Sequence, residues 1–282
     1  MKTTTKVFVF TALSYAAGLA HASLDIVGIS LGMTPSEVAN EIQGYAKEQN
    51  MRPLIRSINL SARDPATRRS VALPNGKFVA QYSVGEARQN ASGADGKDEL
   101  NVNFTPTPGK ERVAAIYRRI GFNPSMAPSN ANLFNDLKTK YGTPSYETPA
   151  SQGAYKSTLI WSFDASGNLM KNFDPEKCRV KLPFPNGSIL SPTSPENSWE
   201  EPILKSWPTV EAYYGSCGTT LLTIRSEINA RIGATQRLYV SLHATKAVID
   251  AQRQANALMQ AGDESAKSEA IKGAASVKSP RL

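Results

Sequence analysis

The chain has 282 residues and a formal net charge of +8. About 260 residues follow the N-terminal 22, which suffices for one large or two small domains. No stretch reaches the roughly 20 apolar residues that a membrane-spanning helix needs, so we expect no transmembrane helix.

The first 22 residues have the pattern of a secretory signal peptide. Lys2 and Lys6 form a charged start, an apolar run covers 7–20, and small residues flank the predicted cleavage site before Ser23. No cysteine follows that could carry a lipid. We therefore expect a soluble periplasmic or secreted protein, without a stable membrane anchor, whose net charge falls by two to +6.

A helix is predicted over 35–49, at the start of a first unit that spans 23–125. Residues 34–37 (Thr-Pro-Ser-Glu) fit a capping box, in which the threonine and glutamate side chains each bind the other residue's backbone N–H. Proline suits the first helical position, and Pro53 prevents continuation. The apolar residues that follow recur on one helix face: Val38, Ile42 and Tyr45. A short strand over 25–30 precedes the helix.

Four segments with alternating apolar residues complete the first unit. A turn at 74–76 (Pro-Asn-Gly) precedes the second of them. The predicted strands are 54–60, 77–86, 99–105 and 112–122.

A second unit is predicted over 126–262. Its helix begins after Ser129 or Asn130, and Gly142 has the character of a residue that ends it. Strands are predicted over 158–163, 218–228 and 237–243, followed by a helix over 246–261. The remainder, 263–282, is small, polar and charged, which predicts a disordered tail.

The order of elements predicts an α+β fold. Each unit has a helix followed by antiparallel strands, so the sequence indicates two related halves whose helices pack on one sheet face. No repeat is visible at the level of individual residues.

A long Pro-rich excursion over 171–216 interrupts the second unit. It begins before Cys178 and ends beside Cys217, the only cysteines of the chain. An even pair in an oxidising compartment predicts a disulfide, and closing a loop of about 40 residues would contribute at most about 4 kcal/mol.

The sequence offers no set of catalytic residues. His243 is the single histidine after the signal peptide, and no nucleophile motif accompanies it. One histidine and two paired cysteines leave no zinc site, and no phosphate-binding glycine loop occurs. We therefore predict no catalytic residues, no metal and no cofactor.

Aromatic and acidic residues gather in the excursion. Tryptophans beside carboxylates suit a glycan-binding or glycosidase cleft, although aromatic anchors that pin a long loop to a sheet would give the same pattern. The candidate binding residues are Trp199, Trp207, Glu196, Glu200 and Glu201.

Basic residues form two groups in the first unit. In an exported protein they favour acidic lipids, anionic glycans or an acidic protein over nucleic acid, and a solvated strand face is the simplest interpretation. The groups are Arg52, Arg56, Arg63, Arg68 and Arg69, and Lys110, Arg112, Arg118 and Arg119.

Two segments resemble a known pattern. Residues 32–38 and 140–144, with Trp161-Ser162-Phe163 later, look like the small exported domains related to β-lactamase inhibitor protein and to outer-membrane assembly lipoproteins. The start over 28–34 is also similar to uncharacterised proteobacterial secreted proteins. The resemblance implies non-catalytic binding of other proteins, without indicating which residues bind.

Together these features predict an exported, non-catalytic protein-binding module, either inhibitor-like or concerned with envelope assembly. Its partner would be another envelope or secreted protein. The alternative is a cell-wall or polysaccharide-acting enzyme, or a glycan binder, that uses the excursion. The sequence leaves the oligomeric state open.

Overall fold

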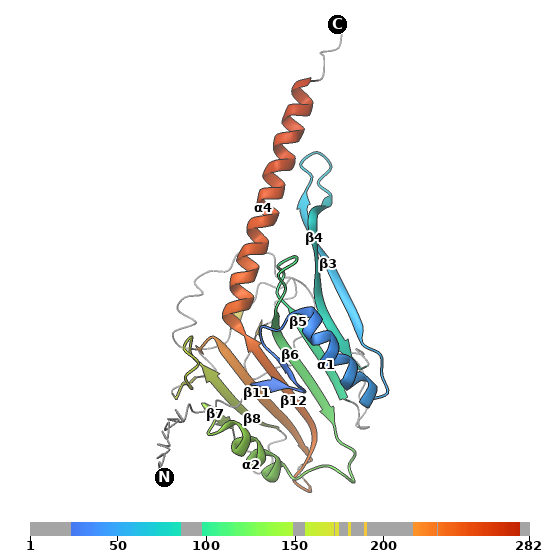
Figure 1. The fold of residues 1–282 in the computed structure, drawn as a ribbon. Coiled ribbons are helices and arrows are strands. Elements are labelled where there is room, and N and C mark those ends of the chain that lie inside the picture. The colour runs from blue at the N-terminus through green and yellow to red at the C-terminus, as the bar shows by residue number, and fades with distance from the viewer. Residues whose placement is uncertain are drawn as a thin grey trace, which may run out of the picture.

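A computed structural model of the chain describes residues 24–85, 98–148, 156–171, 173–174, 180–181, 189–190, 217–229 and 231–276. The predicted signal peptide lies outside these ranges. The described part is an α+β fold built on one eight-stranded antiparallel sheet, which confirms the predicted class (Figure 1). Its strands are β3 (Leu54–Arg63), β4 (Ser70–Val84), β5 (Asp98–Phe104), β6 (Val113–Gly121), β7 (Tyr146–Thr148), β8 (Lys156–Phe163), β11 (Thr220–Asn229) and β12 (Ala234–Ala244).

The sheet has the symmetry that the sequence predicted. Helix α1 (Pro35–Glu48) precedes β3 to β6, and helix α2 (Asn130–Tyr141) precedes β7, β8, β11 and β12. The strand order is β3-β4-β5-β6-β12-β11-β8-β7. The first strand of each half therefore lies at an edge, and the last strands, β6 and β12, pair at the centre. Two helix-plus-four-strand units form a single continuous sheet.

Helix α1 begins as the capping box predicted. The Thr34 N–H donates to Glu37 Oε2 over 2.7 Å, and the Glu37 N–H donates to Thr34 Oγ1 over 3.3 Å. The Thr34 N–H and the Thr34 hydroxyl, which donates to Glu37 Oε2 over 2.8 Å, hold the pKa of Glu37 below its ordinary value. The prediction of a single strand over 25–30 is wrong, because positive φ angles at Val27 and Gly28 turn the chain between β1 (Asp25–Ile26) and β2 (Ile29–Ser30).

The β3–β4 hairpin is longer than predicted. The predicted turn at 74–76 lies inside β4, where the register shifts opposite Asn59 and Ser61. The chain reverses at 64–69, a polar stretch typical of a turn, where the Asp64 N–H donates to the Arg69 carbonyl over 2.9 Å. The proline, asparagine and glycine that suit a turn produce a bulge here, because both strands continue pairing beyond it.

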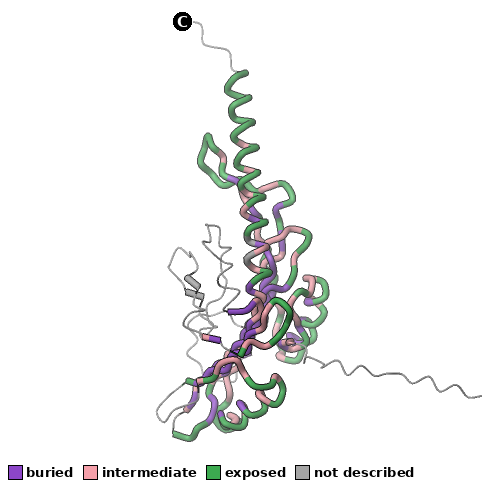
Figure 2. Tube along the Cα trace, turned by 90° about the vertical axis from the view of Figure 1, so that its left-hand side faces the viewer, coloured by how far each residue is buried: buried purple, intermediate pink, exposed green. Residues whose placement is uncertain are grey.

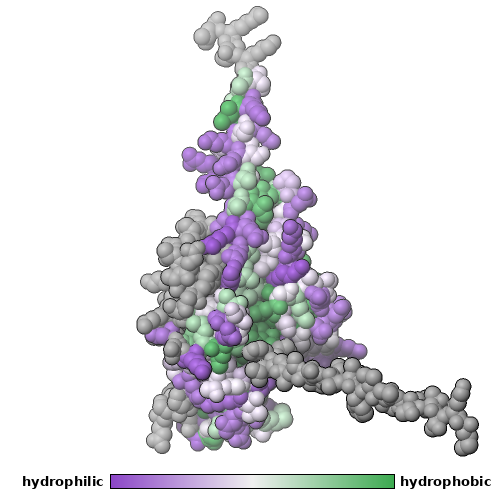
Figure 3. All heavy atoms as spheres, turned by 60° about the vertical axis from the view of Figure 1, so that its left-hand side comes forward, coloured by the Kyte–Doolittle hydropathy of each residue, from purple (hydrophilic) through white to green (hydrophobic). Residues whose placement is uncertain are grey.

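Helix α4 (Thr245–Ser276) is the largest departure from the sequence prediction. It continues through 263–276, which were predicted to be disordered; 277–282 lie outside the described residues. Alanine, glutamate and lysine dominate this stretch and favour a helix once one is established. The helix projects well beyond the sheet, and its distal end is exposed and mostly hydrophilic (Figures 2 and 3).

Helix α4 packs on the sheet face opposite α1, at the outer strands. Val79 contacts the core that includes α1, whereas Phe78 packs with Ala255 of α4. Consecutive strand residues point to opposite faces, so the two helices lie on opposite sides. The Arg63 N–H donates to Asp263 Oδ1 over 2.5 Å and ties the helix to the hairpin.

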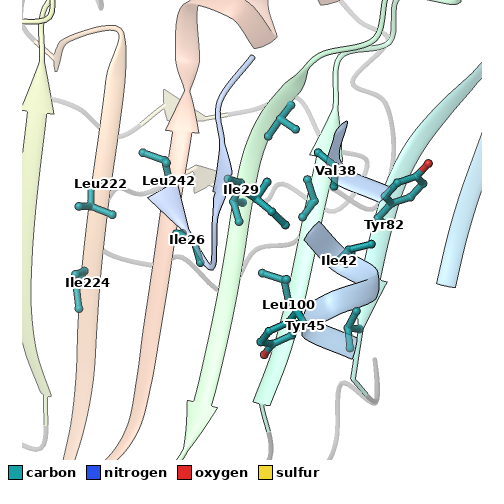
Figure 4. Packing of buried hydrophobic residues seen from close by; sticks show 14 of the residues in the cluster. Ile26, Ile29, Val38, Ile42, Tyr45, Tyr82, Leu100, Leu222, Ile224 and Leu242 are labelled. Carbon is teal, nitrogen blue, oxygen red and sulfur yellow. The ribbon is translucent and has the colours of Figure 1, made fainter. Parts of the chain in front are cut away.

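The main hydrophobic core lies on the face that α1 and α2 cover. Leu100 and Leu242 of the sheet belong to one cluster with Val38 of α1 and Phe134 of α2 (Figure 4). Trp161, which lies in the strand predicted over 158–163, is fully buried there. Burying a large apolar side chain contributes roughly 1.5–3 kcal/mol to stability. Because side chains from both halves belong to this one core, its burial holds the two halves together.

A buried polar network fixes the start of α2. Asn130 Nδ2 donates to Ser157 Oγ over 3.4 Å, and Asn130 Oδ1 accepts from Ser226 over 2.6 Å and from Thr235 over 3.3 Å. These three partners belong to β8, β11 and β12. Buried polar groups need such hydrogen bonds, so the network sets where α2 meets the sheet. The small strands β9 (Val180–Lys181) and β10 (Ile189–Leu190) form a separate pair.

Gly218 and Gly109 make a matched pair for measuring close packing at the start of β11. Both have positive φ, 74° and 73°, but a Cβ on Gly218 would lie 2.4 Å from Ser162 Oγ, whereas Gly109 has open space. We predict that Gly109→Ala costs about 1 kcal/mol from φ alone and Gly218→Ala about 3 kcal/mol or more. Urea unfolding measures both, and equal losses would contradict the packing role.

Candidate functional site

The candidate binding residues of the excursion, Trp199, Trp207, Glu196, Glu200 and Glu201, lie outside the described residues. So does Cys178. Cys217 is described: it is 1% exposed, packs with Ile160, Phe173 and Leu221, and is not a free cysteine. Its pairing with Cys178 remains a prediction.

We predict that the purified exported protein contains no free thiol. The two cysteines are the only ones in the chain, and an oxidising compartment favours their pairing. Thiol titration of the denatured, non-reduced protein should give none, and reduction should release two. Two thiols before reduction would refute the disulfide.

The described part of the chain contains one extended polar surface within the sheet. On the face away from α1 and α2, strand register aligns polar side chains in rows across β5, β6, β12, β11 and β8. We call this surface the polar face. Its members are Glu99, Asn101, Tyr117, Arg119, Thr158, Thr223, Arg225, Glu227, Arg237, Tyr239, Ser241 and His243, and five of these (Tyr117, Thr158, Thr223, Arg225 and Ser241) are buried.

One row of the polar face alternates acid, base and aromatic ring. Arg119 Nη2 lies 2.8 Å from Glu99 Oε1. The next partner across the sheet is Tyr239, whose ring carries the Arg225 guanidinium 4.7 Å from its centroid. Glu227 lies beside this row. The cation–π contact between Arg225 and Tyr239 and the cross-strand ion pair between Arg119 and Glu99 fix these side chains in place.

Glu227 links two arginines at the edge of the row. Its carboxylate lies 3.0 Å from Arg237 Nη1 and 3.9 Å from Arg225 Nη2. Arg225 is 5% exposed, and burial lowers its pKa, while Tyr239 and Glu227 oppose the shift. Arginine keeps its charge in proteins, because its ordinary pKa lies far above neutral pH. The polar face therefore holds a buried cation beneath partly exposed groups.

Tyr117 and His243 lie diagonally across the pairing of β6 with β12, because Tyr117 is opposite Ser241 and His243 is opposite Ala115. Their rings meet edge to face with centroids 4.9 Å apart, and Tyr117 Oη lies 3.4 Å from His243 Nδ1. Although part of the histidine surface is accessible, the surrounding atoms lower its pKa to about 4. The ring is therefore neutral near pH 7. No group of three His, Cys, Asp or Glu side chains in the described ranges could hold a metal ion.

The structure separates the two groups of basic residues. Arg118 faces the core, where its side chain donates to Asp98 over 2.5–3.2 Å beneath the Tyr45 ring. Arg119 pairs with Glu99 on the polar face. The arginines of the other group lie on and beside β3 and in the β3–β4 turn, where they are exposed.

Sequence analysis did not identify the polar face. The sequence shows that Tyr239, Ser241 and His243 alternate on one face of a strand. It does not show that Arg119 lies opposite Tyr239 or that Tyr117 lies opposite Ser241, because that alignment depends on the register between β6 and β12. Alternation of polar residues in several strands was the available signal.

Comparison of the chain with known protein families, with curated proteins and with solved structures finds no match. The resemblance to inhibitor and assembly domains therefore stays a prediction. Across the described ranges, no helix is long and apolar enough to cross a membrane.

We predict that acid weakens the fold through His243. Its pKa is about 4 in the folded protein against an ordinary 6.5, so the unfolded chain binds more protons between these values and stability falls as pH falls through them. The loss should be about 1–3 kcal/mol. Urea unfolding should show a shallower pH dependence for His243→Gln across that interval. Identical slopes would contradict the assignment.

Proposed function

We propose that this protein is an exported, non-catalytic binding module that contacts another envelope or secreted protein through the polar face. The observation that supports this proposal is the row of tyrosine, arginine and glutamate side chains across the centre of the sheet. Tyrosine and arginine are the residue types most enriched among those that dominate binding energy at protein interfaces.

The sheet holds these side chains rigidly. Tyr239 lies under Arg225, and Arg119 and Arg237 each have a carboxylate partner on a neighbouring strand. A surface that is ordered before binding loses little conformational entropy when a partner arrives. The side chains of Arg119 and Arg237 are 30% and 32% exposed, so both present charge to a partner.

The same geometry favours binding over catalysis. The described histidine is neutral near pH 7 and contacts a tyrosine hydroxyl. The carboxylates Glu99 and Glu227 are occupied by arginines. General acid–base catalysis needs groups whose protonation changes near the working pH, and this histidine stays neutral there.

We predict that immobilised protein captures a stoichiometric partner from periplasmic extract, and that the double variant Arg119→Ala/Arg237→Ala binds the purified partner at least about tenfold more weakly. The double variant Lys110→Ala/Arg231→Ala removes the same charge from exposed turns and should bind as wild type. Calorimetry measures the affinities, and circular dichroism checks each fold.

Two results would count against this proposal. Repeated captures without a stoichiometric partner would refute the binding function. A partner that binds the polar-face variant as tightly as the wild type would refute the site while leaving the binding function intact.

A further inference from the structure

The β3–β4 hairpin concentrates positive charge. We call residues 52–77 the basic hairpin. It contains six basic residues and one acid, Asp64, giving a net charge of +5. All six basic residues are exposed: Arg52, Arg56, Arg63, Arg68, Arg69 and Lys77.

The single acid of the basic hairpin is engaged by its own turn. Asp64 Oδ1 accepts from the Ala66 and Thr67 N–H groups over 2.8 and 3.2 Å. These hydrogen bonds lower its pKa. The Arg68 N–H donates to the Asp64 carbonyl over 2.8 Å. The carboxylate therefore orders the turn that carries Arg68 and Arg69.

The arginines of the hairpin differ from those of the polar face in their partners. The salt bridges in the described part of the chain lie between β5 and β6, within β11–β12, between α2 and β7, and along α4. None of them involves a basic residue of the hairpin. Each arginine of the polar face has a carboxylate within salt-bridge distance, whereas the basic side chains of the hairpin are exposed to solvent.

Two of the charges lie on the side of the hairpin that α4 leaves uncovered. Phe78 packs with α4, so the adjacent Lys77 faces the other way. Ala62 lies against Gly262 of α4, so the adjacent Arg63 also faces away. Asp263, which binds the Arg63 N–H, adds its negative charge on the α4 side. The side chains of Arg63 and Lys77 therefore lie away from the helix.

Large apolar side chains are exposed on the same hairpin. Val71 beside the turn is 53% exposed, and Leu54 and Ile55 at the other end of β3 are 61% and 64% exposed. Ten residues of strand span about 33 Å. Charge and apolar groups are thus distributed along an elongated element that projects beside α4 (Figure 1).

We propose that the basic hairpin binds reversibly to a membrane surface rich in anionic phosphate-bearing lipids. Guanidinium groups match phosphate oxygens in charge and geometry, and exposed apolar side chains elsewhere on the same hairpin can enter the headgroup boundary. A fluid lipid surface can adapt to charges spread along a strand and around a turn. This contact is separate from the polar face and does not depend on the proposed protein partner.

The test is co-sedimentation of the full exported chain with vesicles. Phosphatidylcholine vesicles containing phosphatidylglycerol should bind it, pure phosphatidylcholine vesicles should not, and added salt should weaken binding steeply. Arg68→Gln/Arg69→Gln should bind about 25-fold more weakly, at roughly fivefold for each cation removed near an anionic surface. Lys110→Gln/Arg231→Gln, with the same charge loss elsewhere, should stay within about twofold of wild type.

A second double variant, Arg63→Gln/Lys77→Gln, tests the hairpin independently of its turn. Its binding to anionic vesicles should weaken by a similar factor. Thermal unfolding checks that all variants fold. Absence of binding to anionic vesicles, or equal losses in the hairpin and control variants, would overturn the proposal. Tight binding of soluble polyglutamate without vesicle binding would also overturn it and assign the hairpin to an acidic protein.

Discussion

The pairing of β6 with β12 is the constraint on which the rest of this structure depends. These strands end the two halves of the chain, and their register sets Tyr117 opposite Ser241 and Arg119 opposite Tyr239. Without this pairing each half would be a four-stranded sheet with an open edge, which invites association with other chains. With it, one core extends under both helices and one polar face extends across five strands.

The two faces of the sheet use the same backbone for different purposes. One face buries leucine, isoleucine and tryptophan beneath α1 and α2, and contributes the apolar burial that stabilises the fold. The other carries charges that burial would penalise unless they were paired. Arg225 satisfies this requirement through Tyr239 and Glu227, so the polar face combines order with recognition chemistry.

Arginines in the described part of the chain have contrasting environments. Arg118 is held by Asp98 on the core side, Arg119 is paired yet partly exposed on the polar face, and Arg68 is exposed in the hairpin turn. The contrast depends on nearby carboxylates, since β5 supplies an acid opposite or diagonal to each β6 arginine. The hairpin has only Asp64, which its own turn engages, and this imbalance is why charge there is available to an external partner.

Local sequence patterns determined the elements whose cause is local. The capping box at Thr34, the serine that caps α2 and the buried tryptophan strand were all predicted, because each depends on residues within a few positions of one another. The bulge at 74–76 was not predicted, because strand pairing that continues beyond it outweighs the local preference for a turn. The continuation of α4 past Gly262 was not predicted either, although its alanine, glutamate and lysine residues favour a helix that has already begun. The candidate residues of the excursion lie outside the described residues and remain untested.

Sequence alone thus determined the α+β class and the repeated order of helix and strands. The tertiary structure decided which arginines meet acids, because strand register, a long-range property, sets the distance between charges on different strands.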